Sequence, residues 1–188
     1  MNKSACAVKL LIFILLVAVS CRTRIPPPKD VPVSPTIESE AMKAPVDDIE
    51  MVNFISSLLN INIEASDNLH LYMLISQWYG VPHKLAGRDK NGIDCSAFVL
   101  MVYSKVYNYN LNRTSQQMIN DVRIIRKNQL TEGDLVFFKT SGNRISHVGI
   151  YLKDNKFVHV SSSRGVTISK LDDAYWARTF HAAGRVKK

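Results

Sequence analysis

One cysteine and two histidines are the residues in this chain best suited to covalent chemistry. Cys95 stands in "GIDCSAFVLMVYSKVY", where Asp94 is a good helix N-cap ahead of an apolar run. His147 stands in "SHVGIYL" and His159 in "KFVHVSS". A cysteine nucleophile needs an imidazole to move its proton and a polar third group to hold that imidazole's tautomer. The predicted arrangement is therefore Cys95 as nucleophile, His147 as base and His159 as the third residue.

The position of Cys95 has opposing electrostatic consequences. The free N–H groups and the dipole of a first helical turn favour a thiolate, whereas the neighbouring charge of Asp94 disfavours it. If Cys95 forms an ion pair with His147, the thiol should react with alkylating agents well below its ordinary pKa of about 8.5. The structural alternatives are a buried cysteine that only fills space and, for His159, a satisfied core histidine.

The turn between the two histidine-bearing strands decides whether the rings meet. A turn of two or four residues places the histidines on opposite faces of the sheet. A three-residue turn, Lys153 to Asn155, instead pairs Gly149 with His159, so that His147, Gly149 and His159 share one face. Gly149 then leaves room for the rings, and Asn155 suits the left-handed conformation that such turns require. We therefore predict the odd-length turn.

The elements that position these residues are predicted to be helices first and strands afterwards. Apolar spacing predicts a helix over 48–60 and another from a cap at Ser66 or Asp67 to a stop at Gly80. The segment 95–107 is apolar nearly all round and should form a buried helix. A short polar helix is expected at 114–121, and short strands are expected at 134–139, 146–153, 156–162, 165–170 and 181–187. This order indicates an α+β domain with helices packed on a central antiparallel sheet.

The first twenty residues read as a secretory signal. Lys3 and Lys9 precede an apolar stretch that is shorter than the roughly 20 residues of a membrane span. The following "AVSC" resembles a lipobox, which predicts lipidation of Cys21; ordinary cleavage near Ser20 is the alternative. We therefore expect an exported, lipid-anchored protein. Arg22, the residue after the lipidation cysteine, favours sorting to the outer membrane, facing the periplasm, if the cell is diderm.

Proline and glycine divide the rest of the chain. Six of seven prolines lie between Pro26 and Pro45, and all eight glycines lie at Gly80 or later, so the proline stretch reads as an extended tether. With Cys6 lost in the signal and Cys21 lipidated, no disulfide framework is possible. The predicted organisation is a signal at 1–20, the lipidated cysteine and tether at 21–47, an N-terminal helical segment at 48–66 and the catalytic domain at 67–188.

Charge and composition narrow the partners. The net charge of +8 falls to +6 without Lys3 and Lys9, which suits an anionic surface such as cell-wall polymer or lipid headgroups. The chain has no recognised nucleic-acid motif and no dense Lys/Arg run, so no nucleic acid is expected. The cysteine and histidines lack the paired short spacing of a zinc site. We expect no metal or cofactor, and a monomer.

Several sequence blocks, in order, resemble the NlpC family of papain-like cell-wall peptidases. They are "GVPHKLAGRDKNGIDCSAFVLMVY", "RTSQQM", "LTEGDLVFFKTSGNRISHVGIYLKDNKFVHVSSSRGVTISKL" and "YWARTFHAAGRV". Within the family the chain is most similar to short murein endopeptidase lipoproteins of the MepS or Spr type. The resemblance runs from about residue 67 to the C-terminus. It implies a papain-like fold, hydrolysis of amide bonds in peptidoglycan stem peptides through a thioacyl intermediate, and the roles given above for Cys95, His147 and His159.

The chain departs from the family pattern at three positions. His83 stands where the motif "PYxxGG" has tyrosine, Ala86 replaces its first glycine, and "DCSA" has Ala97 in place of glycine. Ala97 lies inside the predicted helix and suits it. His83 either donates to the developing oxyanion beside the Cys95 backbone N–H, or it signals altered specificity or lost activity.

Four further residues are candidates for substrate contact: Ser96, Arg113, Ser161 and Trp176. Each has a structural role as its alternative. Two other functions also stay open at this point. One is a non-catalytic peptidoglycan-binding lipoprotein on the same fold, and the other is an amidase or acyltransferase that uses the same thioacyl intermediate.

Overall fold

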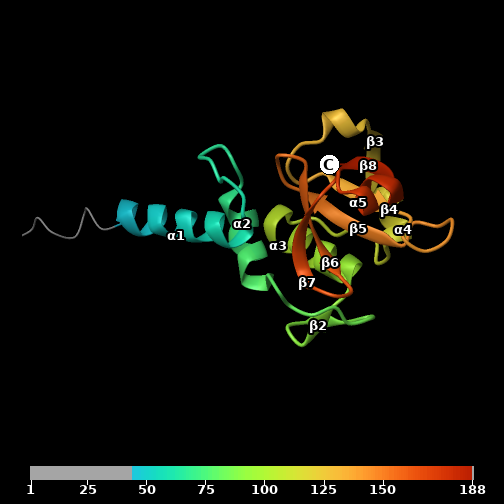
Figure 1. Cartoon of the computed structure of the whole chain (residues 1–188), viewed down its shortest axis with the longest axis horizontal. Coiled ribbons are helices and arrows are strands. Elements are labelled where there is room, and N and C mark those ends of the chain that lie inside the picture. Colours follow the sequence, from blue (N-terminus) through green and yellow to red (C-terminus); the bar gives the residue numbers. More distant parts are fainter. Residues whose placement is uncertain (1–43, 188) are drawn as a thin grey trace, which may run out of the picture. The chain divides into compact units, whose positions relative to one another are not determined.

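The computed structural model describes residues 44–187, with side chains described from residue 48. The predicted signal, the lipidation site Cys21 and most of the predicted tether lie outside the described residues. The described part is an α+β arrangement of helices and a six-stranded antiparallel sheet (Figure 1), as predicted. No helix in this part is long and apolar enough to cross a membrane.

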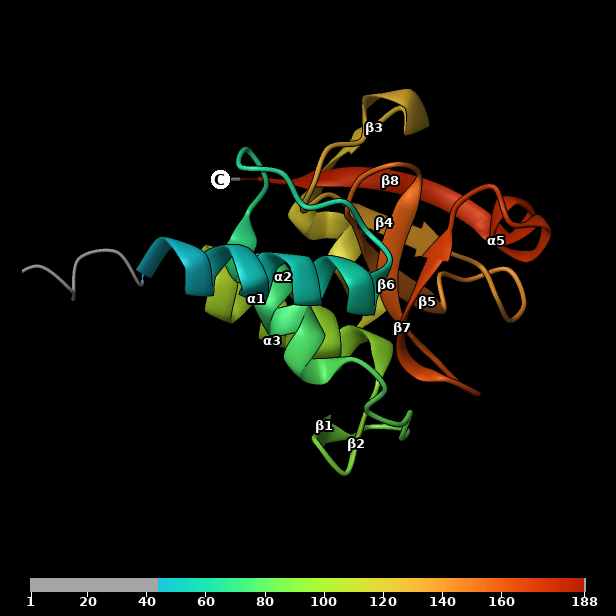
Figure 2. The ribbon, with the colours of Figure 1, turned by 60° about the vertical axis from the view of Figure 1, so that its left-hand side comes forward.

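The first half of the described chain contains three helices. They are α1 (Ala44–Leu59), α2 (Leu69–Trp78) and α3 (Cys95–Tyr107), and they group on one side of the sheet (Figure 2). The N-cap of α2 is Asn68, whose side chain accepts from Leu71 N, so the prediction of Ser66 or Asp67 was wrong. Asp67 instead accepts from the backbone N–H of Glu64 and from Lys153 Nζ, both at 2.8 Å.

The sheet has the strand order β3-β8-β4-β5-β6-β7. Its strands are β3 (Val122–Ile125), β4 (Leu135–Phe138), β5 (His147–Tyr151), β6 (Lys156–Ser161), β7 (Gly165–Lys170) and β8 (Phe180–Val186). Strand β3 was not predicted, and neither was the small hairpin of β1 (Arg88–Asp89) and β2 (Gly92–Ile93). These strands are too short to show a period-2 pattern, and β3 is an edge strand on which Ile124 is exposed.

Short helical segments complete the fold. The polar helix expected at 114–121 is divided into α4 (Ser115–Met118) and the 3₁₀ turn η1 (Ile119–Asp121), with Thr114 as its N-cap. A second 3₁₀ turn, η2, spans Lys127–Gln129. Helix α5 (Ala174–Thr179), between β7 and β8, was not predicted.

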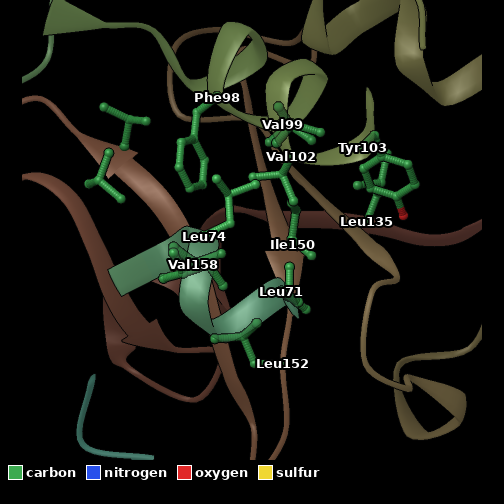
Figure 3. Close-up of a cluster of buried hydrophobic side chains, with 14 of the residues drawn as sticks. Leu71, Leu74, Phe98, Val99, Val102, Tyr103, Leu135, Ile150, Leu152 and Val158 are labelled. Atoms are coloured by element: carbon green, nitrogen blue, oxygen red, sulfur yellow. The ribbon is translucent and has the colours of Figure 1, made fainter. Parts of the chain in front are cut away.

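Two apolar clusters lie on the two faces of the sheet. The larger one joins the helices to the face that presents Leu135, Ile150 and Val158, with side chains such as Phe98 and Val102 reaching it from α3 (Figure 3). The smaller cluster uses the alternate residues of the strands, as the pleat requires. Its members are Val136, Phe138, Phe157 and Leu171, covered by Trp176 and Phe180.

The hairpin between β5 and β6 confirms the predicted odd-length turn. Ile150 pairs with Val158, and Leu152 N donates to Lys156 O at 2.9 Å, which leaves the three residues 153–155 in the turn. Asn155 is left-handed (φ 63°), as predicted, and Asp154 is left-handed as well (φ 50°). The same register places Gly149 opposite His159, so the two histidines share one face.

Candidate active site

Helix α3 places Cys95 in its first turn, at a cavity of about 970 Å³. Asp94 is the N-cap: its Oδ1 accepts from Ala97 N at 2.7 Å. Because the cap fixes where the helix begins, it also fixes where the sulfur lies. The cavity is lined from several elements, including Cys95, His83, His147, Ser161, Arg164 and Trp176.

The Cys95 thiol has a raised pKa. Burial is the largest cause, and the charge of Asp94 adds to it. Hydrogen bonding from the backbone N–H groups of Val148, Ser96 and Cys95 itself acts in the opposite direction without offsetting burial. The predicted stabilisation of the thiolate by the helix start is therefore outweighed. Val148 directly follows His147 on β5, so its effect on the thiol pKa indicates that the sulfur lies near that strand.

The two predicted histidines are in hydrogen-bond contact. His147 Nε2 lies 3.1 Å from His159 Nδ1, and His159, which is fully buried, lies 3.0 Å from Ser169 Oγ through its Nε2. Since Nε2 of His147 is occupied by His159, its Nδ1 is the nitrogen left for a proton from Cys95. This is the arrangement of a base held by a third residue.

Both imidazoles are neutral at pH 7. Burial, with a smaller contribution from the charge of His83, lowers the pKa of His147 to about 4. The pKa of His159 is lowered further, first by burial and then by the charges of His147 and Arg164. With the pKa of the Cys95 thiol raised and that of His147 lowered, both groups favour their uncharged forms.

Trp176 of α5 packs against both imidazoles. Its ring stacks on His147 (centroids 5.3 Å apart, 27° between planes) and meets His159 edge to face at 4.6 Å. Trp176 was predicted as a substrate contact, with a structural role as the alternative. It lines the cavity, but its clearest contacts are with the histidines, whose ring planes it holds.

Ser96 and Arg113 form a closed hydrogen-bonded group with Asp94. Arg113 donates to Ser96 Oγ at 2.8 Å and to Asp94 Oδ2 at 2.9 Å, and Ser96 Oγ donates to Asp94 Oδ1 at 2.7 Å. Burial alone would raise the pKa of Asp94, but hydrogen bonds from Arg113, Ala97 and Ser96 lower it. Both residues line the cavity, so they brace the start of α3 and border the site together.

His83 lies on the loop between α2 and β1, at the same cavity. It forms an isolated parallel bridge with Ile93, and Lys84 N donates to Ile93 O at 3.2 Å, which ties the loop to the residues just before Cys95. The His83 side chain is exposed. Ala86, on the same loop, has φ 58°, a conformation that favours the glycine found there in the family motif.

The remaining predicted residue, Ser161, ends β6 at the rim of the cavity. Its Oγ accepts from Ser163 N at 3.3 Å and from Arg164 N at 3.4 Å, so it holds the turn before β7. Two residues that the sequence did not reveal also serve the site. Ser169 bonds His159, and Ser146 Oγ accepts from Thr140 N at 2.9 Å next to His147. Lone serines give no periodic signal, and their use depends on strand register.

No group of three or more His, Cys, Asp or Glu residues within 44–187 is placed to hold a metal ion.

Comparison with curated proteins gives several relatives that match about 60% of the chain. It is 40% identical over 116 residues to the "Probable endopeptidase NlpC homolog" of Haemophilus influenzae, covering 62% of this chain and 61% of that protein. It is 41% identical over 113 residues to the "Probable endopeptidase NlpC" of Escherichia coli, covering 60% of this chain and 73% of that protein. It is 38% identical over 111 residues to the E. coli "Murein DD-endopeptidase MepS/Murein LD-carboxypeptidase", covering 59% and 58%. The match thus spans less than two thirds of the first and third relatives.

Solved structures and a family model agree with these relatives. A lipoprotein-like NLP/P60 family protein from Staphylococcus aureus has a TM-score of 0.59 at 24% identity, covering 69% of this chain and 46% of that one. An NlpC/P60 family protein from Bacillus cereus has a TM-score of 0.58 at 26% identity, covering 66% and 41%. The NlpC/P60 family model matches residues 80–185, a segment that contains Cys95, His147 and His159. With the fold, the site and the matched segment in agreement, the chain belongs to the NlpC/P60 family.

Proposed function

We propose that the chain is an exported, lipid-anchored cysteine endopeptidase that hydrolyses amide bonds in peptidoglycan stem peptides or cross-links. The observation that carries the proposal is the placement of Cys95 and His147 on one cavity, with His147 bonded through Nε2 to His159 at 3.1 Å. The relatives named as probable endopeptidases and as a murein endopeptidase supply the substrate class.

The first half of the reaction forms a thioacyl enzyme. Nδ1 of His147 takes the proton of Cys95 as the sulfur attacks the carbonyl carbon of the scissile amide, and the carbonyl oxygen becomes an oxyanion. The imidazolium donates to His159 through Nε2–H while it holds the proton. It then gives the Nδ1 proton to the amine nitrogen as the C–N bond breaks, and the amine leaves.

The second half releases the acid. Neutral His147 takes a proton from water as the water oxygen attacks the thioacyl carbon, and the proton returns to sulfur as the C–S bond breaks. One water is consumed, and Cys95 ends as a thiol. The neutral resting pair suits this general-base route, since both protonation states needed to start it are those present at pH 7.

We assign the oxyanion to the backbone N–H of Cys95, with His83 as a second donor. His83 lines the same cavity, is exposed, and lies near enough for its charge to lower the pKa of His147. A donor aimed at a developing oxyanion in a partly closed site is worth roughly 100-fold or more in rate. His83 would thus take the place of the family tyrosine.

The N-terminal segment is assigned to export and anchoring. Lipidation of Cys21 would tether the domain through a proline-rich stretch that extends ~3 Å per residue where it adopts polyproline II. The peptidase would then face the periplasm from the outer membrane of a diderm cell. Cys21→Ser should abolish metabolic labelling with a fatty acid and release the protein from membranes; labelling that persists in the variant would contradict the assignment.

The test of activity is digestion of purified muropeptides, with mass spectrometry of the products and a parallel binding measurement. We expect the wild-type chain to cleave and Cys95→Ala to bind without cleaving. Products that gain the mass of an added amine in place of water would instead indicate acyl transfer. Loss of a terminal amide group alone would indicate an amidase.

The second candidate function is peptidoglycan binding without catalysis, and the observation that favours it is His83 in place of the family tyrosine. A Mycobacterium tuberculosis structure described as a non-catalytic NlpC/p60 domain protein adapted to peptidoglycan binding has a TM-score of 0.51 to this chain at 21% identity. The fold therefore occurs in a protein so described. Binding of muropeptides without cleavage by either the wild type or Cys95→Ala would establish this reading.

A further inference from the structure

We propose that Ser169 is a positioning residue that sets the tautomers of both imidazoles and thereby leaves Nδ1 of His147 unprotonated as the base. The inference rests on the proposed function for its catalytic meaning, although the tautomers themselves can be measured without any substrate. Ser169 lies on β7, two strands away from His147, and touches it only through His159.

The strand register brings Ser169 to His159. In the β6–β7 pair, Phe157 lies opposite Ser169 and His159 lies opposite Thr167, so Ser169 is the diagonal neighbour of His159 on the same face. Ser169 is 5% exposed, and its Oγ lies 3.0 Å from Nε2 of fully buried His159. No other side chain among the described residues is hydrogen-bonded to that nitrogen.

The two hydrogen bonds that link Ser169, His159 and His147 can have only two consistent polarities, that is, two directions from donor to acceptor. A neutral imidazole has one N–H donor and one acceptor nitrogen. If Ser169 Oγ accepts from His159 Nε2–H, then Nδ1 of His159 accepts from His147 Nε2–H, and Nδ1 of His147 keeps its lone pair. If Ser169 donates instead, both rings reverse and Nδ1 of His147 carries a hydrogen, which cannot take the proton of Cys95.

Arg164 is compatible with the first polarity, which the role of His147 as base requires. Its Nη2 donates to Ser169 Oγ at 3.4 Å, so a permanent cation lies on the oxygen that faces His159. Oγ can accept from both Arg164 and His159 because a hydroxyl has two lone pairs, and the cation disfavours a positive charge on His159. When His147 becomes an imidazolium, the proton accordingly stays on His147, where the leaving amine needs it.

Packing alone does not select a tautomer. Phe157 stacks on His159 with centroids 5.0 Å apart and 26° between planes, and Trp176 meets its edge. These rings fix the plane of the imidazole. Only a hydrogen-bond partner at Nε2 distinguishes a ring nitrogen that carries hydrogen from one that does not.

The experiment compares Ser169→Ala with two matched variants in the full chain. Nitrogen-15 NMR reports the protonation of each ring nitrogen, and the chain has only five histidines to assign. Thr167→Val removes a neighbouring buried hydroxyl that, within the described residues, bonds neither imidazole, whereas Ser169→Thr keeps the hydroxyl. Thermal unfolding checks that each variant is folded.

We expect single Nε2–H tautomers for His147 and His159 in the wild type, Thr167→Val and Ser169→Thr. Ser169→Ala should show mixed tautomers and a kcat lowered about tenfold with little change in KM, the effect that one hydrogen bond supports. Wild-type tautomers in Ser169→Ala, or altered tautomers with unchanged kcat, would overturn the proposal. If the wild type cleaves no substrate but Ser169→Ala still alters the tautomers, the role of Ser169 is supported and the proposed peptidase function is rejected.

Discussion

Burial shifts the pKa values of Cys95 and His147 in opposite directions, and this decides how the site rests. The thiol pKa is raised and the imidazole pKa is lowered to about 4, so neither group is charged at pH 7. These shifts favour a neutral pair over the ion pair considered from the sequence.

The first prediction concerns the reactivity of the thiol. Because the pKa of Cys95 is raised, its alkylation by iodoacetamide should increase only above the ordinary thiol pKa of about 8.5. The rate is measured by intact mass across pH 5 to 10, in a Cys6→Ser, Cys21→Ser background that leaves Cys95 as the only thiol of the chain. Rapid alkylation that is already constant at pH 6 would show a thiolate–imidazolium pair and contradict the neutral site.

The second prediction concerns His83. Replacement by alanine should lower kcat by roughly 100-fold, the usual effect of removing one oxyanion donor, whereas tyrosine, the residue of the family motif, should retain most of the activity. Lys84→Ala, on the same exposed loop, is the matched control. Full activity in His83→Ala would remove His83 from the oxyanion site.

At the scale of elements, Gly149 allows the two strands to bring the histidines together. A Cβ at this position would lie 2.7 Å from the Val158 carbonyl oxygen and 2.7 Å from the ring of Phe157. The added methyl group would therefore meet backbone on one side and an aromatic ring of the smaller apolar cluster on the other, so it has little room to relax.

The third prediction follows from this contact. Gly149→Ala should lower the free energy of unfolding by about 1–3 kcal/mol, the usual cost of overpacking, and should also lower kcat because β6 carries His159. Urea denaturation and muropeptide digestion measure the two effects. A variant with wild-type stability and activity would show that this approach of the strands is not needed.

The helices and turns also differ in whether the sequence could reveal them. The turn at 153–155 was predictable because only an odd length placed both histidines on one face and because Asn155 tolerates a left-handed backbone. Helix α5 was not, since six residues carry too little periodicity and the position of Trp176 depends on rings from other strands. Asn68 replaced the predicted caps because Asp67 was engaged by Lys153, a contact between distant residues.

Across the whole molecule, family and fold followed from motif order, but the electrostatics of the site did not. Burial of His147 and His159 depends on the combined packing of β4, β5, β6 and α5, which no local pattern contains. The same holds for Ser169, whose role appears only once the β6–β7 register is known. The sequence therefore predicted that the two histidines meet, whereas the shifts in their pKa values follow from burial that only the folded structure defines.

The fourth prediction links this burial to acid stability. The pKa of His147 is about 4 in the folded state and about 6.5 in the unfolded chain, so the unfolded state binds more protons between these values. This contribution to stability is complete above pH 6.5 and is lost as the pH falls toward 4, on the order of 3 kcal/mol for His147. Urea denaturation across this range should show a shallower loss in His147→Asn; identical slopes would contradict the lowered pKa of His147.

The most direct test of the account is the rate at which the full chain cleaves a purified cross-linked muropeptide, followed by mass. We expect peptide products that together exceed the substrate by one water, with Cys95→Ala and His147→Ala both reduced to the background rate although they still bind. Cleavage by Cys95→Ala at the wild-type rate would contradict the account, because the bond would then be broken without this sulfur.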